Sequence, residues 1–325
     1  MIDKKAILVT GGAGFIGSHL CSALVERNIP VICFDNFCDF YDPTIKRNNI
    51  YELQKSDLFT LIEADIRDKY ALRNVFENNH IGMVIHLAAM AGVRPSIENP
   101  NLYVDVNVAG TMNLLNECRT SNISRIIFAS SSSVYGNNKV PFKESDSVDN
   151  PVSVYAATKK AGELLCYTWH HLYDMSIVCL RFFTVYGPRQ RPDLAIHKFT
   201  RLISMDTPIE VYGNGESSRD YTYIDDIIYG ILQAIKKIYN TPYSIYQIYN
   251  LGNSNPITIH HLINTIENIL GKRATIINKE MQPGDVYATS ADINLAMKEL
   301  NYQPVYPFEE GIKRFIDWFT LNKSL

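Results

Sequence analysis

The sequence lacks the features that would place it in several common classes of protein. Its 325 residues carry 31 Lys and Arg against 34 Asp and Glu, and no basic stripe that would suit nucleic acid is present. The six cysteines are scattered without a C-x-x-C pair, so we expect reduced, buried thiols. No apolar run approaches the roughly 18 residues that cross a bilayer. The start of the chain does not resemble a signal peptide.

Metal-ligand spacings and flexible linkers are missing as well. The eight histidines include no H-E-x-x-H, and the adjacent pairs at 170–171 and 260–261 cannot share one helical face. We therefore expect no metal site. No repeat, low-complexity segment or Gly/Ser-rich linker divides the chain. A hydrophobic fraction of 46% and a charged fraction of 20% suit a soluble globular enzyme, which we expect in the cytoplasm with no membrane or nucleic-acid partner.

Up to residue 183 the sequence alternates short apolar runs with helical patterns. Strands are expected at 5–10, 30–36, 59–68, 83–89, 125–133 and 176–183. Helices are expected at 15–28, 68–79, 103–120 and 154–173. This alternation of β-branched strands and helices predicts an α/β fold with a doubly wound parallel sheet, covered on both faces.

After residue 183 the alternation stops and turn signals multiply, although helices are still expected at 258–270, 291–300 and 308–321. We predict a smaller C-terminal α/β lobe that is intermeshed with the first and separated from it by a cleft. Residues 1–183 then form the dinucleotide-binding domain, to which some later segments return. Residues 184–325 mainly form the substrate lobe.

The segment "VTGGAGFIGSHL" follows the first predicted strand and opens the first helix. Gly11, Gly14 and Gly17 are spaced G-x-x-G-x-x-G, which permits a tight turn and close approach of a pyrophosphate to the helix N-terminus. Asp35 closes the second strand, where a carboxylate accepts hydrogen bonds from ribose hydroxyls and repels a 2′-phosphate, which favours NAD over NADP. The alternatives are a plain strand–helix turn and an ordinary cap or turn residue at Asp35.

The segment "SVYAATKKAG" places Tyr155 and Lys159 four residues apart, so both lie on one face of a helix. A strand that ends in four serines, 130–133, precedes this helix. The alternative is an amphipathic helix with Tyr and Lys at its solvated edge. Counted together with the glycine loop, the tyrosine, lysine and serines favour a catalytic set.

These motifs resemble those of a known superfamily. "TGGAGFIGSHL", "DN" after the second strand, "SSSSVYG", "YAATKKAGE" and "RFFTVYGP" resemble the extended short-chain dehydrogenases/reductases, over nearly the whole chain. "AGVRPSIENP", "VPFKESD", "RQRPDLAIHKF" and "SRDYTYIDDI" are most similar to nucleotide-sugar 4-epimerases, particularly UDP-glucuronate 4-epimerases. The resemblance implies a Rossmann fold, tightly bound NAD, a UDP-sugar substrate and an isomerase that proceeds through a 4-keto intermediate without net redox.

The resemblance also implies roles for individual residues. Tyr155 would be the base, Lys159 its electrostatic partner and Ser131 the hydroxyl that orients the substrate, with Ser132 as the alternative to Ser131. Since a free tyrosine has a pKa near 10, we expect Lys159 and the nicotinamide charge to lower it by ~3 units, about 4 kcal/mol. The expected cofactor-binding residues are Gly11, Gly14, Phe15, Ile16, Gly17, Asp35, Asn36, Asp65, Ile66, Leu87, Ala88, Ala89, Tyr155 and Lys159.

Substrate recognition is expected mainly from the second half of the chain. Arg191 is the expected partner of a uronate carboxylate, supported by Thr184, because a guanidinium binds a planar carboxylate bidentately. Each arginine could instead form a structural ion pair. By resemblance, further substrate contacts are Ser132, Ser133, Arg94, Lys198, Arg219 and Asp285. Where glucose-type relatives often carry an arginine, this chain has Gln282, which puts one phosphate contact in doubt.

Three alternatives stay open at this stage. The substrate could instead be UDP-glucose or a UDP-N-acetylhexosamine, or the reaction could be decarboxylation of UDP-glucuronate. A dinucleotide-binding protein without activity is a third possibility, although the serine, tyrosine and lysine are all present. Relatives commonly form homodimers through the helix that carries Tyr155, and small residues at 157, 161 and 162, with Leu115, would permit that approach. The alternative is that these residues face the sheet.

Overall fold

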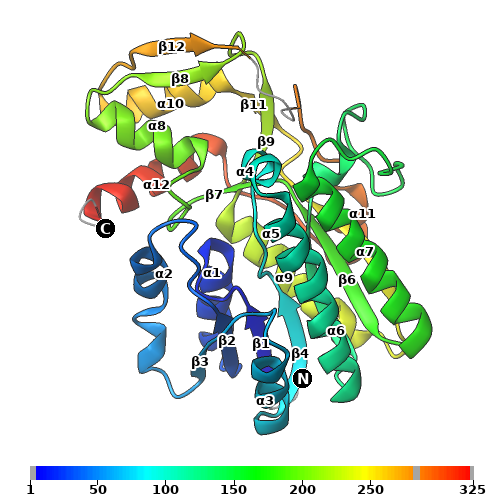
Figure 1. Ribbon diagram of the computed structural model, residues 1–325. Coiled ribbons are helices and arrows are strands. Elements are labelled where there is room, and N and C mark those ends of the chain that lie inside the picture. The colour runs from blue at the N-terminus through cyan, green and yellow to red at the C-terminus, as the bar shows by residue number, and fades with distance from the viewer. Residues whose placement is uncertain (1–4, 281–285, 323–325) are drawn as a thin grey trace.

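The computed structural model describes residues 5–280 and 286–322 and shows a large lobe and a small lobe (Figure 1). The large lobe contains a seven-stranded sheet in the order β10-β6-β5-β4-β1-β2-β3, in which every neighbouring pair is parallel. Its strands are β1 (Ala6–Thr10), β2 (Val31–Asp35), β3 (Phe59–Glu63), β4 (Ile81–His86), β5 (Arg125–Ser131), β6 (Ser176–Phe182) and β10 (Tyr246–Leu251). The predicted doubly wound parallel sheet is confirmed.

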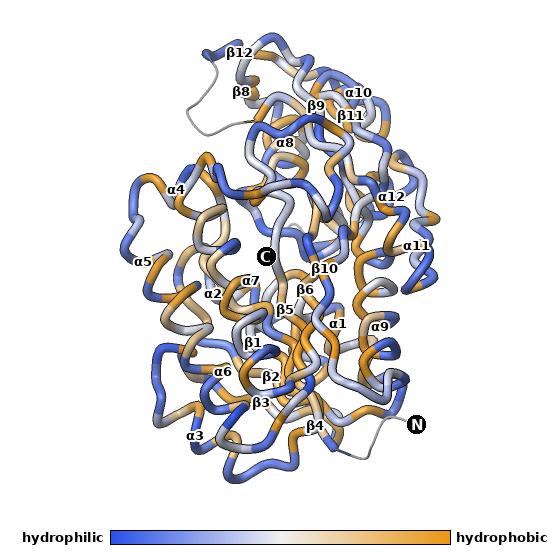
Figure 2. Tube along the Cα trace, turned by 90° about the vertical axis from the view of Figure 1, so that its right-hand side faces the viewer, coloured by the Kyte–Doolittle hydropathy of each residue, from blue (hydrophilic) through white to orange (hydrophobic). Residues whose placement is uncertain are grey.

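Both faces of this sheet are covered because its strands are apolar on both sides. Ile7 and Val9 of β1 pack on one face against α1 (Phe15–Val25) and α9 (Ile224–Asn240). Leu8 faces the other side, where α3 (Lys69–Asn78), α6 (Thr111–Thr120) and α7 (Val154–Tyr173) lie. Figure 2 shows the hydrophobic residues running along the strands in the middle of this lobe.

The chain reverses direction across the sheet between β1 and β4. From β1 the chain moves outward through β2 and β3, and β4 then returns to the opposite side of β1. In open parallel sheets such a reversal leaves a crevice at the carboxyl ends of the strands. The loops after β1, β2, β3 and β4 therefore meet at one end of the sheet.

The small lobe begins directly after β6, at Phe183. It contains a three-stranded sheet in the order β11-β9-β7 and a two-stranded sheet of β12 and β8. Its strands are β7 (Thr184–Tyr186), β8 (Ile209–Tyr212), β9 (Ser218–Tyr223), β11 (Pro256–Thr258) and β12 (Ile276–Lys279). Its helices are α8 (Ala195–Ser204), α10 (Ile259–Leu270) and α12 (Phe308–Leu321), whereas α11 (Asn294–Leu300) packs against β10 and α9 of the large lobe. The lobes are intermeshed, because β10 returns to the large sheet.

Several predicted boundaries are wrong. The strands expected at 59–68 and 83–89 end at Glu63 and His86. The region 103–120 is not one helix but α5 (Pro100–Val104), a π-helical turn η2 (Asp105–Gly110) and α6. Within that turn the Asn107 amide bonds both the N–H and the C=O of Met90, which holds the widened backbone against the loop after β4. The fifth strand ends at Ser131, since the next residues form a 3₁₀ turn, η3 (Ser132–Tyr135).

The remaining elements are α2 (Pro43–Ile50), η1 (Leu53–Lys55) and α4 (Val93–Glu98). Within residues 5–280 and 286–322, no helix has the length and apolar character needed to span a bilayer, and no trio of His, Cys, Asp or Glu is grouped for a metal ion. All six cysteines are free thiols; five are buried, whereas Cys38 is partly exposed.

Helix α7 begins and ends where the sequence predicts, but its small residues do not all face outward. An added Cβ at Gly162 would lie 2.3 Å from the Phe128 ring, so this glycine packs on the sheet. Leu115 is 2% exposed and belongs to the core on the same side. Gly162 and Leu115 therefore cannot contribute to the expected contact between subunits. Ala157, by contrast, is exposed.

Candidate functional site

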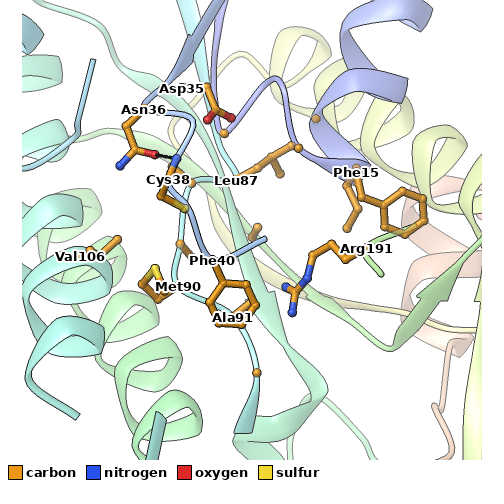
Figure 3. Close-up of a pocket in the computed structure, with 18 of the residues that line it drawn as sticks. Phe15, Asp35, Asn36, Cys38, Phe40, Leu87, Met90, Ala91, Val106 and Arg191 are labelled. Atoms are coloured by element: carbon orange, nitrogen blue, oxygen red, sulfur yellow. Dashed lines mark hydrogen bonds between the residues drawn. The ribbon is translucent and has the colours of Figure 1, made fainter. Parts of the chain in front are cut away.

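A cavity of about 550 Å³ lies at the carboxyl ends of the strands, in the crevice that the sheet order predicts (Figure 3). Every expected cofactor-binding residue lines it, as do Ser131, Thr184 and Arg191. The loops after four strands, the end of β5, helix α7 and the start of the small lobe thus converge on one space. This convergence shows which residues meet, and their individual roles stay predictions.

The glycine loop forms the part of the cavity wall that an anion could approach. Gly11 has φ +69°, and a Cβ there would lie 2.8 Å from the Ala88 nitrogen. A Cβ on Gly17 would lie 2.2 Å from the Gly11 carbonyl oxygen. Helix α1 follows with Gly14 as its N-cap, so no side chain caps its first turn. The amide groups of that turn are therefore open to a diphosphate, as in dinucleotide sites.

Asp35 is 6% exposed and anchors two turns at the cavity edge. Its Oδ2 accepts a hydrogen bond from the Ala13 N–H at 3.1 Å, and its Oδ1 accepts one from the Phe37 N–H at 2.9 Å. Asp35 therefore does stabilise turns, which is the alternative role that the sequence left open. Each carboxylate oxygen keeps a second lone pair, so a ribose hydroxyl can still be bound.

Sequence reasoning missed Lys46, a buried lysine of α2 that also lines the cavity. Its ammonium lies 3.7 Å from Asp35 Oδ1 and 3.3 Å from the Cys38 sulfur. The ammonium partly offsets the negative charge that Asp35 presents to a ligand. No local pattern predicts this contact, because it depends on how α2 packs against α1.

Asp65 follows β3 and is held by its neighbours. The Asn36 amide donates to it at 2.8 Å, and Arg67 donates at 2.9 and 2.7 Å. The Arg67 hydrogen bonds are the main reason that the pKa of Asp65 falls to about 2. The carboxylate is thus ionised and fixed at the cavity edge.

The catalytic candidates meet where β5 ends beside α7. The Ser131 hydroxyl lies close enough to Tyr155 to lower the pKa of the phenol, and it donates to Ser133 Oγ at 3.2 Å. The Lys159 ammonium donates to the Ala129 carbonyl at 2.7 Å. Ser131 Oγ also accepts from the Ser133 N–H at 3.1 Å. Ser131 rather than Ser132 faces the tyrosine, because Ser132 begins the 3₁₀ turn and is not among the described residues that line the cavity.

The electrostatics of Tyr155 differ from the expectation. Burial raises the pKa of Tyr155, while the Ser131 hydrogen bond and the Arg191 charge pull it down. Burial also lowers the pKa of Lys159 to about 8. The lowering expected from Lys159 together with the nicotinamide charge stays a prediction. In the protein alone the Lys159 ammonium donates to the Ala129 carbonyl, lies 5.9 Å from the ring centroid and does not lower the pKa of Tyr155. The lowering cation is Arg191 instead.

Arg191 reaches the cavity from the loop before α8. Its guanidinium forms two hydrogen bonds to Asp193, at 2.9 and 2.6 Å, and lies 5.1 Å from the Phe40 ring centroid. Figure 3 shows Phe40 and Arg191 on the same side of the cavity. The arginine therefore already holds a carboxylate in the bidentate geometry predicted for a uronate. Asp193 and Phe40 were not predicted.

Other predicted substrate residues are not among the described residues that line the cavity. Arg94 of α4 stacks on the Tyr212 ring of β8 at 4.3 Å, so it spans the two lobes. Arg219 of β9 donates to the carbonyls of Ser218 and Tyr287. The others are Ser132 and Ser133 in the 3₁₀ turn and Lys198 on α8. Asp285 and Gln282 lie outside the described residues.

Comparisons with known proteins agree with this geometry. The sequence profile of the GDP-mannose 4,6 dehydratase family matches residues 8–315. A UDP-glucuronate 4-epimerase from Thermodesulfobacterium geofontis is 44% identical over 319 residues, which cover 98% of this chain and 97% of that protein. The structure of UDP-glucuronic acid 4-epimerase from Bacillus cereus, in complex with UDP-glucuronic acid and NAD, has a TM-score of 0.91 at 37% identity, covering 97% and 99% of the chains.

A second solved structure broadens the range of substrates among similar proteins. UDP-glucose 4-epimerase from Thermotoga maritima, solved with UDP-glucose, has a TM-score of 0.88 at 29% identity and covers 98% of this chain and 99% of its own. Chains of this fold therefore include epimerases named for a neutral sugar and for a uronate.

Proposed function

Since the chain belongs to the GDP-mannose 4,6 dehydratase family, we propose that it is an isomerase that inverts carbon 4 of a UDP-sugar, converting UDP-glucuronate to UDP-galacturonate. One observation carries the proposal. The same cavity holds a Ser131–Tyr155 hydroxyl pair and an arginine whose guanidinium already holds a carboxylate. A hydroxyl-activating pair beside a carboxylate-binding cation matches the two ends of a uronic acid.

The cofactor is NAD, and the residues present fit it. The crowded glycines leave space for a diphosphate at the uncapped N-terminus of α1, and Asp35 with Asp65 offers carboxylate oxygens to ribose hydroxyls. When bound, NAD would supply reversible hydride exchange at carbon 4 of the sugar, with no net redox.

Residues of the chain itself transfer the proton and orient the sugar. Ser131 holds the 4-hydroxyl against Tyr155, whose phenolic oxygen takes its proton and later returns it. Because burial raises the pKa of Tyr155, the tyrosine needs the Ser131 hydrogen bond and nearby positive charge to serve as a base. Between the two proton transfers the 4-keto sugar turns within the cavity, held at its nucleotide end.

Substrate choice depends on the carboxylate subsite. We assign Arg191 to the carboxylate, with Thr184 as a supporting hydroxyl, and Asp193 occupies the guanidinium in the absence of substrate. The carboxylate of a uronate can accept the same two hydrogen bonds from Arg191 that Asp193 accepts, whereas a neutral hexose has no carboxylate to do so. Arg219, Lys198, Arg94, Ser132, Ser133 and Asp285 are proposed as the remaining substrate contacts. Residues 1–183 would then bind mainly the cofactor and 184–325 mainly the nucleotide sugar.

The proposed assembly is a homodimer in the cytoplasm. Ala157 and Leu164 on α7 and Val104 on α5 leave an apolar surface exposed, and α5 and α7 are in contact with each other. A second copy of the same pair of helices would cover that surface. The six free thiols suit a reducing compartment. Light scattering at micromolar concentration should give twice the chain mass, and Leu164→Arg should give the monomer. A wild-type monomer would refute the dimer.

The decisive test of the function follows two substrates by NMR. The purified protein, with no added NAD, is incubated with UDP-glucuronate and separately with UDP-glucose. We expect UDP-galacturonate from the first and no product from the second. Conversion of UDP-glucose would retain the mechanism and refute the carboxylate assignment. Release of CO₂ with a UDP-pentose would identify a decarboxylase, and no reaction even with added NAD would refute the proposed function.

A further inference from the structure

A buried ion pair lies directly behind the catalytic side chains, and the mechanism does not use it. Arg181 of β6 donates to Glu163 of α7 through Nε at 2.8 Å and Nη2 at 2.9 Å. Both side chains are 1% exposed. Ser130 of β5 donates its hydroxyl to the same carboxylate at 2.6 Å. Three elements of the large lobe are thus joined at one carboxylate.

This carboxylate makes one of three polar contacts between the end of β5 and α7, beside the apolar packing of Phe128 on Gly162. Three consecutive residues at the end of β5 each contact one residue of the helix: Ala129 with Lys159, Ser130 with Glu163, and Ser131 with Tyr155. The helix residues are spaced four apart, so all three lie on one face of α7. Two of these contacts belong to the proposed chemistry. The third contact, between Ser130 and Glu163, sets the position of α7 along the direction of β5.

Arg181 extends the same network to the serine turn. It pairs with Ser130 in the parallel register of β5 and β6, and its guanidinium lies 4.7 Å from the Tyr135 ring centroid. Tyr135 ends the 3₁₀ turn after Ser131, and its hydroxyl donates to the Asn250 side chain at 2.7 Å. The arginine therefore contacts both the helix and the turn between which Ser131 is held.

Stability alone does not account for this pair. Replacing a buried ion pair with apolar side chains of similar size is often neutral or stabilising, because the two charges must be desolvated. Removing only one partner is costly, because a buried charge is left uncompensated. The pair is thus a poor source of net stability, although it defines a specific geometry.

We propose that Glu163 and Arg181 are positioning residues, which set the approach of Ser131 to Tyr155 by fixing the register of α7 on β5. This inference rests on the proposed function of Ser131 and Tyr155. A displacement of about 1 Å between reacting groups can cost 10²-fold in rate. The pair therefore controls turnover rather than substrate affinity.

The test replaces both charges at once, in Glu163→Met with Arg181→Met, so that neither member of the pair is left buried alone. The Lys160 ammonium, 3.8 Å from Glu163, is 23% exposed and remains in contact with solvent. We expect a folded protein that retains its NAD and binds substrate with an unchanged KM, but with kcat lowered on the order of 10–100-fold. The pH profile of kcat should also shift, because the Ser131 hydrogen bond contributes to the pKa of Tyr155. A double change at the distant pair Lys237 and Glu299 is the control and should leave kcat unchanged.

A folded double variant with wild-type kcat and pH profile would overturn the proposal. If the double variant does not fold, Ser130→Ala decides, because it removes one hydrogen bond and leaves the ion pair intact. This variant should lower kcat without a change in KM, and wild-type kinetics would again overturn the proposal. The variants are assayed on whichever nucleotide sugar the wild type converts. If UDP-glucuronate is not converted, the proposed function is refuted, while the positioning role is still tested on the sugar that is converted.

Discussion

The two halves of the cavity hold their polar side chains in different ways. In the cofactor half, Asp35 accepts hydrogen bonds from backbone amides and Lys159 donates to a backbone carbonyl. In the sugar half, Arg191 is held by the side chain of Asp193, which is 40% exposed. Asp35 and Lys159 are thus fixed mainly by the backbone, although Asp65 in the same half is held by the Asn36 and Arg67 side chains. Arg191 depends on one pair of side chains that can separate.

This difference matches what each half has to do. A cofactor that stays bound through many turnovers is best served by groups that never change partners. A substrate that enters and leaves is better served by a cation with an exchangeable partner, because the guanidinium is never left without a carboxylate. The comparison predicts that changes in the cofactor half affect every substrate, whereas changes in the sugar half affect uronates selectively.

Tyr155→Phe should have the largest effect. The ring keeps its packing, but no oxygen remains to take the proton, so we expect kcat to fall on the order of 10²–10⁴-fold for every substrate. The bound NAD, measured by absorbance after denaturation, should be unchanged. Tyr70→Phe, at a tyrosine 83% exposed, is the matched control. A variant with more than a tenth of wild-type turnover would contradict the assigned base.

Gly17→Ala tests the backbone-built half directly. The added methyl would lie 2.2 Å from the Gly11 carbonyl oxygen, so the loop must move and NAD content should fall severalfold. Gly14→Ala is the matched control, since its methyl would meet the same oxygen at 3.3 Å. Both are measured as moles of nucleotide per mole of protein. Equal NAD content in the two variants would show that crowding in this loop is not what shapes the site.

Arg191→Ala sharpens the contrast between the halves. Losing a charge-assisted contact worth about 1.5–3 kcal/mol should lower kcat/KM for UDP-glucuronate on the order of 10–100-fold. NAD content should not change. Arg273→Ala, at an arginine 80% exposed, is the control. Asp193→Asn should act in the opposite direction and lower KM for UDP-glucuronate, because the competing carboxylate is gone. If neither variant alters the kinetics with the uronate, Arg191 does not hold its carboxylate.

Lys159→Met tests the buried ammonium through the stability of the folded protein rather than through activity. Lowering the lysine pKa from 10.5 to about 8 costs the folded state about 3 kcal/mol below pH 8, where both states bind the proton. From pH 8 towards 10.5 the folded state releases this proton first, so wild-type stability should rise relative to the variant. Urea unfolding of both nucleotide-free proteins at pH 7 and 9.5 measures this difference. If the difference in unfolding free energy between the two proteins is the same at both pH values, burial does not lower the pKa of Lys159.

The sequence predicted the cofactor half more completely than the sugar half, for a physical reason. Gly11, Asp35 and Tyr155 act through local spacing at strand ends and on one helix, and such spacing is visible in the chain. Lys46 beside Asp35 in the cofactor half, Phe40 beside Arg191 in the sugar half, and the Glu163–Arg181 pair depend on how separate elements pack, so no local sequence pattern predicts them. The π-helical turn at 105–110 was missed for the same reason, since Asn107 widens it by bonding a distant loop.

The most direct test of the account uses UDP-glucuronate that carries deuterium at carbon 4. If the hydride is taken from and returned to that carbon within one closed site, the UDP-galacturonate formed in ordinary water keeps the deuterium at carbon 4. NMR of the product shows this as a missing H4 signal, without any added NAD. Appearance of the H4 signal would mean exchange with solvent, and would contradict epimerisation by a retained cofactor.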